Sequence, residues 1–273
     1  MRGKSNPGIM APKGVRGKPG VCTMYGTQMA YTCQPLWRFQ IPHGGALVSS
    51  EFVDHLYRAL SKDRLEAYRP PNGSDLDMLT NYFWNIDLIE ALVPCMHAVE
   101  LALRNSIHAA LTDRYGTDMW FYQPGLLDSS ELVQLGRALQ YAARKPPLLA
   151  GKIVAALNFG FWVALLAGRY ERRFWQPESS TLKQAVFPNA SAFSRQQIAH
   201  RFDEILLLRN RCFHHEGIWF RANLPQEHSD IHDAIEWINP TLQTAILAVD
   251  NFPAVYNGRA GVEAGLKQRL GIT

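Results

Sequence analysis

Residues 75–115 read DLDMLTNYFWNIDLIEALVPCMHAVELALRNSIHAALTDRY and decide the fold of this chain. Apolar residues recur throughout at the three- and four-residue spacing of a helix, so we predict one long helix from Asp75 to about Tyr115, kinked at Pro94. Helical spacing continues over most of the chain after residue 49, and alternating strand patterns are not evident. We therefore predict an all-α, single-domain protein.

Short segments that contain Pro, Gly or Asn divide the rest of the helical pattern. The segment EFVDHLYRAL at 51–60 follows two serines that can cap a helix. Further helices are predicted at about 128–144, 148–170, 194–216, 229–249 and 261–269. The predicted organisation is a lead-in at 1–45, a helical domain at 46–260 and a short C-terminal helix or tail at 261–273.

The basic charge of the chain is concentrated at its start. The formal charge is +4, from 28 Lys and Arg against 24 Asp and Glu, but residues 1–50 hold six of the bases and none of the acids. The remaining 22 bases and 24 acids give −2, which argues against a broad nucleic-acid-binding surface on the folded part. Residues 1–45, basic and rich in Gly and Pro, are expected to form a disordered tail; an RNA-attracting arm, or a later start at Met10, Met24 or Met29, are the alternatives.

Neither a membrane segment nor a disulfide framework is indicated. No apolar run reaches the ~18 residues that a membrane helix needs, and the nearest, 153–168, contains Asn158 and two Gly. The cysteines are far apart in the sequence and form no C-x-x-C pair, which suits a reducing compartment. They are Cys22, Cys33, Cys95 and Cys212. We therefore expect a cytoplasmic protein with no membrane partner.

One pair of histidines has a spacing that a divalent metal can use. His228 and His232 stand at i and i+4 on a predicted helix, with Asp230 and Asp233 beside them. The pattern is not HExxH, and it lies at a predicted helix start, where acidic and polar residues are ordinary. We predict no metal site and no cofactor.

The most unusual polar segment closes the predicted helix at 194–216. Its sequence IAHRFDEILLLRNRCFHHE, at 198–216, ends in five clustered polar residues: Arg209, Asn210, Arg211, His214 and His215. On a regular helix, Asn210 shares a face with His214 and Arg211 with His215, whereas Arg209 and His214 lie about 140° apart. The helix is therefore distorted here, or the site is composite, with another helix or another copy of the protein supplying the facing groups.

These residue types can cleave RNA without a metal. An imidazole can take the proton of a ribose 2′-OH or protonate the 5′ leaving oxygen, and a guanidinium can hold the phosphate as charge develops. The alternative is structural: Arg209 pairs with an acid such as Asp203, Glu204 or Glu216, and the histidines favour the C-terminus of the helix as cations.

A second polar line crosses the long helix at 95–111, CMHAVELALRNSIHAAL. Glu100, Arg104 and His108 follow one another at i+4 beside a core stripe, and Asn105 lies next to Arg104. One interpretation is a salt-bridge ladder that fixes the position of the helix. The other is that this line faces residues 209–214 and completes the site.

The segment LLLRNRCFHHEGIW at 206–219 resembles the terminal motif of the bacterial Abi-like (abortive infection) family of the HEPN superfamily, whose signature is Arg, four to six residues, then His. Arg209 and His214 match with four residues between them. Residues 82–111, LNFGFWVALLAGRY at 157–170 and the Phe187-Pro188 pair also look like the family, so the resemblance covers about residues 49–250.

The resemblance implies a HEPN-like helical bundle with additional helices, a homodimer, and metal-independent cleavage of RNA in phage defence or as a toxin. A small RNA or an antitoxin is an implied partner. By the same resemblance, Arg209 binds the scissile phosphate, His214 is the general acid and base, and Asn210 orients either of them. The supporting or second-motif residues are Glu100, Arg104, Asn105, His108, Arg211 and His215. The alternative function is a non-catalytic helical module that binds RNA or a partner.

Overall fold

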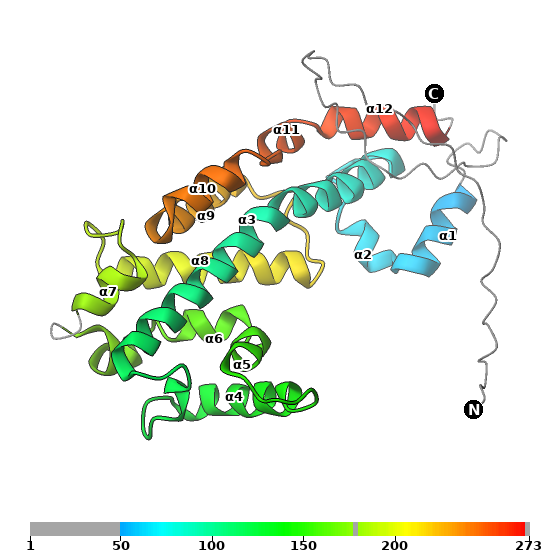
Figure 1. Cartoon of the computed structure of the whole chain (residues 1–273). Coiled ribbons are helices and arrows are strands. Elements are labelled where there is room, and N and C mark those ends of the chain that lie inside the picture. Colours follow the sequence, from blue (N-terminus) through cyan, green and yellow to red (C-terminus); the bar gives the residue numbers. More distant parts are fainter. Residues whose placement is uncertain (1–49, 177–179, 271–273) are drawn as a thin grey trace, which may run out of the picture. The chain divides into compact units, whose positions relative to one another are not determined.

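The computed structural model describes residues 50–176 and 180–270, and every regular element in these ranges is a helix (Figure 1). The predicted all-α class is confirmed for this part of the chain. The tail predicted at 1–45 lies outside the described residues. Among the described helices, none is both long and apolar enough to cross a membrane.

Helix α3 (Asp75–Tyr115) is the central element, and its predicted extent is confirmed. Ser74 and Asp77 form a capping box at its start: the Ser74 hydroxyl accepts from the Asp77 backbone N–H, and the Asp77 carboxylate accepts from the Ser74 N–H. The helix runs through Pro94 and ends at Gly116, whose φ of +67° suits a residue without a side chain. Buried residues occur along its whole length, so α3 is packed on several sides.

The remaining helices precede or follow α3 in the sequence (Figure 1). Those that precede or directly follow it are α1 (Ser50–Leu60), α2 (Lys62–Glu66), the 3₁₀ turn η1 (Trp120–Tyr122), α4 (Ser129–Ala142), α5 (Ala150–Ala156) and α6 (Phe159–Ala164). The later elements are η2 (Gly168–Tyr170), the π-helical turn η3 (Glu171–Trp175), α7 (Ser180–Val186), α8 (Arg195–Phe213), α9 (Leu224–Ile238), α10 (Pro240–Leu247), α11 (Phe252–Tyr256) and α12 (Arg259–Leu270). Helices α9, α11 and α12 all pack directly against α3.

Two predicted helices are each divided in the structure, so the predictions of continuous helices at 148–170 and 229–249 are wrong. At Asn158 the chain leaves α5, and the Asn158 side chain accepts the Phe161 N–H at 2.9 Å to start α6. At Asn239 it leaves α9, and the Asn239 side chain accepts the Leu242 N–H to start α10. In both cases an asparagine side chain satisfies a backbone donor that a continuous helix would use internally.

The described core has a large cluster and a small one. The large cluster joins α3 to α4–α9 and is rich in fully buried aromatic side chains, such as Trp120 and Trp162. The small cluster joins α1 and α2 to the first turns of α3 through Val53, Leu65 and Met78. Trp219, in the segment between α8 and α9, packs against both clusters. That segment follows the Arg/His motif, so both clusters help to position the motif.

Candidate functional site

The Arg/His motif occupies the last turn of α8. The helix starts with a capping box of Ser194 and Gln197 and ends at Phe213, earlier than the predicted 216. His214 is the C-cap residue, and its backbone N–H still donates to the Asn210 carbonyl at 2.8 Å. His215 has a φ of +60°, in the left-handed region. The predicted common face of Arg211 and His215 assumed a regular helix and is therefore wrong, because the chain turns between them.

Arg209 is partly buried, whereas Arg211, His214 and His215 are exposed. Its guanidinium contacts Glu100 Oε2 at 3.5 Å and Asn210 Oδ1 at 3.4 Å, and it lies 4.5 Å from the centre of the Phe213 ring. The side chains of Arg209 and Glu100 are each 27% exposed. The Nε of Arg209 is buried and has no hydrogen-bond partner among the described residues. One donor of a half-buried cation is therefore left without an acceptor.

Glu100 is the link between the two polar segments found in the sequence. It lies on α3 and pairs with Arg209 of α8. The acids that the structural alternative assigned to Arg209 do other things: Glu204 pairs with His200 at 3.5 Å and Glu216 with Arg211 at 3.4 Å. A contact between α3 and α8 therefore replaces the local pairing within α8.

The rest of the second motif makes different contacts. Arg104 Nε donates to Asn105 Oδ1 at 3.1 Å, within α3, and no ion pair joins Arg104 to Glu100 among the described residues. His108 Nδ1 accepts the indole N–H of the buried Trp120 at 3.0 Å. Burial lowers the pKa of His108, and the nearby Arg104 lowers it further, against an opposing effect of Asp118. His108 lies about 12 Å from Glu100 along the helix axis. Its described contact is with Trp120, so it anchors η1 to α3.

His214 presents an exposed imidazole that makes no hydrogen bond or ion pair with the described residues. The residues that follow His214 are held by hydrogen bonds with α2 and with α3. The His215 carbonyl accepts from Arg64 Nη2 of α2 at 2.7 Å. The backbone N–H groups of Ile218 and Trp219 donate to the buried Asn85 side chain of α3, at 2.6 and 3.2 Å.

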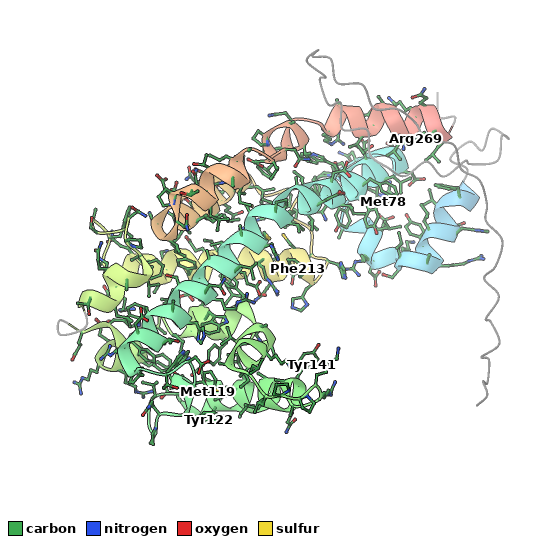
Figure 2. All side chains as sticks on the ribbon, viewed as in Figure 1. Met78, Met119, Tyr122, Tyr141, Phe213 and Arg269 are labelled. Atoms are coloured by element: carbon green, nitrogen blue, oxygen red, sulfur yellow. The ribbon has the colours of Figure 1, made fainter. Side chains whose placement is uncertain are left out.

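Most side chains at the end of α8 and just after it are exposed. Phe213, labelled in Figure 2 at the end of α8, is 49% exposed, and Phe220 is 63% exposed. Arg211, His214 and His215 are exposed as well. The end of α8 therefore presents one half-buried guanidinium, exposed imidazoles and exposed aromatic rings.

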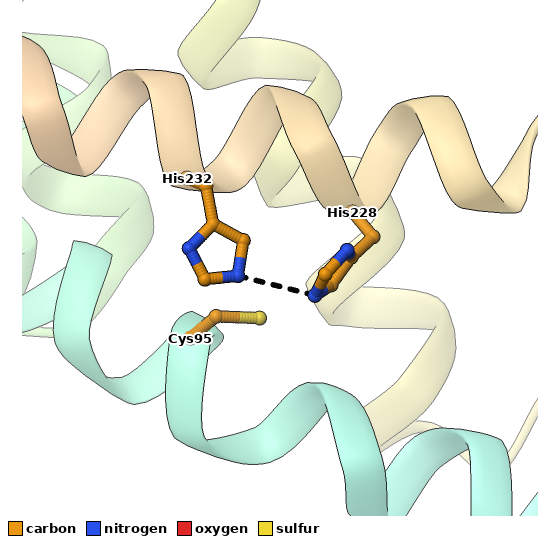
Figure 3. A group of neighbouring side chains, drawn as sticks. All are labelled: Cys95, His228 and His232. Atoms are coloured by element: carbon orange, nitrogen blue, oxygen red, sulfur yellow. Dashed lines mark hydrogen bonds between the residues drawn. The ribbon is translucent and has the colours of Figure 1, made fainter. Parts of the chain in front are cut away.

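A separate polar cluster is buried between α3 and α9 (Figure 3), and the segment that follows α10 contributes an aspartate to it. We call it the core cluster, and its members are Cys95, His228, His232 and Asp250. The two imidazole Nε2 atoms are 3.1 Å apart, and Asp250 Oδ2 lies 3.2 Å from that of His228 and 3.7 Å from that of His232. Cys95 Sγ and one nitrogen of each ring lie within 4.8 Å of one another.

Burial dominates the protonation of the core cluster. Desolvation lowers the pKa of His228 and of His232, and in each case the Asp250 carboxylate opposes it. Desolvation raises the pKa of the Cys95 thiol to about 12. The Sγ–H donates to the Leu92 carbonyl at 3.1 Å.

The sequence shows the spacing of His228 and His232, but the two acids beside them in the sequence are not their partners in the structure. Asp230 and Asp233 both pair with Arg201 of α8, at 2.9 and 3.4 Å, and so point away from the histidines. Cys95 and Asp250 take their place. Nothing local to α9 indicates these two residues, although the position of both histidines on the buried face of an amphipathic helix was a usable signal.

Searches against models of protein families, against curated proteins and against solved structures give no match for this chain.

Proposed function

We propose that this chain is a metal-independent endoribonuclease of the Abi-like/HEPN type that cleaves RNA with Arg209, Asn210 and His214. The observation that carries the proposal is the state of the charged groups at the end of α8. The two Nη groups of Arg209 make only long contacts, at 3.4 Å to Asn210 and 3.5 Å to Glu100, while His214 is exposed beside the same turn. A guanidinium held only by long contacts can turn to a phosphate, and an exposed imidazole suits proton transfer.

Each residue has a defined role in the proposed reaction. Arg209 holds the scissile phosphate and stabilises the charge that develops on it, because paired N–H donors match phosphate oxygens. His214 moves protons between the ribose 2′-OH and the 5′ leaving oxygen. Asn210 is within 3.4 Å of the guanidinium and orients it. The expected products are a 2′,3′-cyclic phosphate and a 5′-hydroxyl.

Glu100 acts as a positioning residue in this proposal. Its contact with Arg209 is long, 3.5 Å, and both side chains are partly open to water, so the attraction is weak. A phosphate dianion or diester can therefore replace it without a large loss. In the absence of RNA, Glu100 holds the guanidinium of Arg209 next to α3.

The proposed site is completed by a second copy of the chain. Among the described residues Arg209 contacts Glu100, Asn210 and Phe213, and no imidazole contacts it. A homodimer that brings two ends of α8 together supplies the missing group. Together with the family resemblance, this supports a role in phage defence or as a toxin that a small RNA or an antitoxin restrains.

The test is RNA cleavage by the purified full chain in EDTA, with helix content checked by circular dichroism. We expect cleavage by the wild type and a loss of at least 100-fold in His214→Ala and Arg209→Ala, as is typical of an essential proton-transfer group or charge-stabilising donor. His200→Ala is the matched control, because His200 is an exposed histidine at the other end of α8. Its activity should equal that of the wild type.

Two results would contradict the proposal. Equal cleavage by all four proteins excludes these residues from catalysis. Salt-sensitive RNA binding without cleavage, lost in Arg209→Ala, favours the non-catalytic RNA-binding module.

A further inference from the structure

We propose that the core cluster is a structural zinc site. Its ligands are Cys95 Sγ, His228 Nε2, His232 Nε2 and Asp250 Oδ2. The site is independent of the proposed ribonuclease function and uses none of its residues. One sulfur, two imidazole nitrogens and one carboxylate oxygen are donors that zinc accepts, and four protein ligands are typical of a site with a structural role.

The spacing of the donor atoms fits a single ion. Zinc–nitrogen and zinc–oxygen bonds of about 2.0–2.1 Å at tetrahedral angles place neighbouring donors about 3.4 Å apart. The three contacts among the histidines and Asp250 are 3.1, 3.2 and 3.7 Å, which bracket this value. The ideal sulfur-to-nitrogen separation is about 3.6 Å. Cys95 Sγ lies within 4.8 Å of one nitrogen of each ring, and Asp250 falls outside that group, so Cys95 and Asp250 must approach each other by about 1 Å or more as the ion binds.

The orientations of the side chains converge as well. Figure 3 shows the Cys95 side chain of α3 directed towards the space between the two rings of α9. Asp250 Oδ1 accepts the Phe252 backbone N–H at 3.0 Å, which leaves Oδ2 to face the histidines. The Phe252 ring stacks on His228, with 4.3 Å between the ring centres, and holds that imidazole in its plane. Asp250 is thus fixed by a second hydrogen bond and His228 by packing, whereas the other ring nitrogen of His232 is buried without a partner among the described residues.

A cation also offsets a buried negative charge. The Asp250 side chain is only 10% exposed, and its described ion-pair partners are the two histidines, with no Lys or Arg. The two Nε2 atoms are 3.1 Å apart, and each has a lone pair that can bind a metal ion once its hydrogen is on Nδ1. A divalent ion at this point balances the carboxylate. With one thiolate and one carboxylate as ligands, the site is electrically neutral.

Binding requires one proton to leave. The Cys95 thiol, which donates to the Leu92 carbonyl, gives its proton to solvent as the zinc–sulfur bond forms. No electron is transferred, because zinc has no redox chemistry in this setting. The bound ion then ties α3 to α9 and to the segment between α10 and α11, which are distant in the sequence.

The test uses the full chain with Zn²⁺ and Co²⁺ as the only probes. We expect about one zinc ion per chain after purification without chelator. After chelator treatment, added Co²⁺ should give the intense visible bands of a tetrahedral ion and a thiolate-to-cobalt charge-transfer band. Zn²⁺ should displace Co²⁺ and raise the midpoint of thermal unfolding.

Cys95→Ala and Cys212→Ala are a matched pair, since both cysteines are free, buried and 2% exposed. Cys95→Ala should abolish the charge-transfer band and weaken zinc binding by more than about 100-fold, the upper range for the loss of a group that only supports a ligand. Cys212→Ala should bind both ions like the wild type. Asp250→Asn should weaken binding by at least about tenfold.

The wild-type measurements keep the proposal testable even if a variant does not fold. A wild-type chain that gives no thiolate-to-cobalt band and no thermal shift with Zn²⁺ would overturn the proposal and leave the core cluster as a hydrogen-bonded network. A band that persists in folded Cys95→Ala would overturn it too, because another cysteine would then hold the metal.

Discussion

Replacing Asn85 by leucine should destabilise the protein strongly, because Asn85 is the acceptor for two backbone donors in the segment after the Arg/His motif. Its Oδ1 accepts the N–H of Ile218 at 2.6 Å and that of Trp219 at 3.2 Å. Its Nδ2 donates to the Tyr68 hydroxyl at 3.3 Å. Asn85 is 2% exposed, and leucine has the same number and branching of side-chain heavy atoms, so the substitution removes the hydrogen bonds while keeping the outline of the side chain.

The expected loss is about 2–4 kcal/mol. A buried donor that loses its acceptor costs about 1–3 kcal/mol. Ile218 is fully buried, so water cannot replace the lost acceptor and the cost lies at the upper end of that range. Trp219 is partly exposed and its bond is longer, so its cost lies at the lower end. The apolar surface of leucine offsets only part of this sum.

Urea unfolding followed by circular dichroism measures the effect as the difference in extrapolated unfolding free energy, provided that the m-value is unchanged. Asn105→Leu is the control, because Asn105 lies exposed on the same helix and should change stability by less than about 0.5 kcal/mol. A loss below about 1 kcal/mol in Asn85→Leu, or an equal loss in Asn105→Leu, would refute the argument from unsatisfied donors.

Three further outcomes are expected. Burial lowers the pKa of His108, so folding favours its neutral form, and the free energy of unfolding should fall as the pH drops below about 6.5. His108→Gln keeps an acceptor for Trp120, so its unfolding free energy, measured in urea, should decline less than that of the wild type between pH 7.5 and 5.5. An equal decline in both proteins would contradict this. Hydrogen bonds from Arg69 lower the pKa of Glu66 to about 2. The contribution of Glu66 to stability is therefore present above its unfolded pKa of about 4.5 and disappears towards pH 2. In unfolding experiments, Glu66→Gln should be less stable than the wild type at pH 7 and should approach it at pH 3. Deletion of residues 1–20 removes five bases and no acid. It should weaken RNA binding at low salt, measured by filter binding, and leave the rate of cleavage at saturating RNA unchanged. A complete loss of cleavage would contradict this.

Sequence periodicity was sufficient for the long elements and insufficient at two asparagines. Helix α3 was predicted correctly because its apolar repeat is long and both ends carry cap signals. Asn158 and Asn239 each start a new helix, yet they sit inside patterns that keep apolar residues at helical spacing on both sides. The apolar repeat shows which residues face the core, and it does not show whether one helix or two present them.

The candidate site was partly predictable for a related reason. The polar residues of α8 were found directly, because a charged turn at the end of an apolar helix is unusual. The partner of Arg209 was left open between three acids near it in the sequence and the polar line at 95–111, and in the structure it is Glu100 of that line. The approach of Cys95 to His228 likewise depends on how α3 packs against α9, which no local spacing encodes.

Helix α3 connects the fold to the proposed site at two points. Asn85 holds the segment after the motif, and Glu100 contacts Arg209. The geometry of the motif therefore depends on α3, although neither His214 nor Arg209 belongs to it. It follows that a variant in α3 can reduce RNA cleavage without any contact to RNA. Such a loss should track unfolding free energy across variants and recover at lower temperature, whereas the loss in His214→Ala should persist in a fully folded protein.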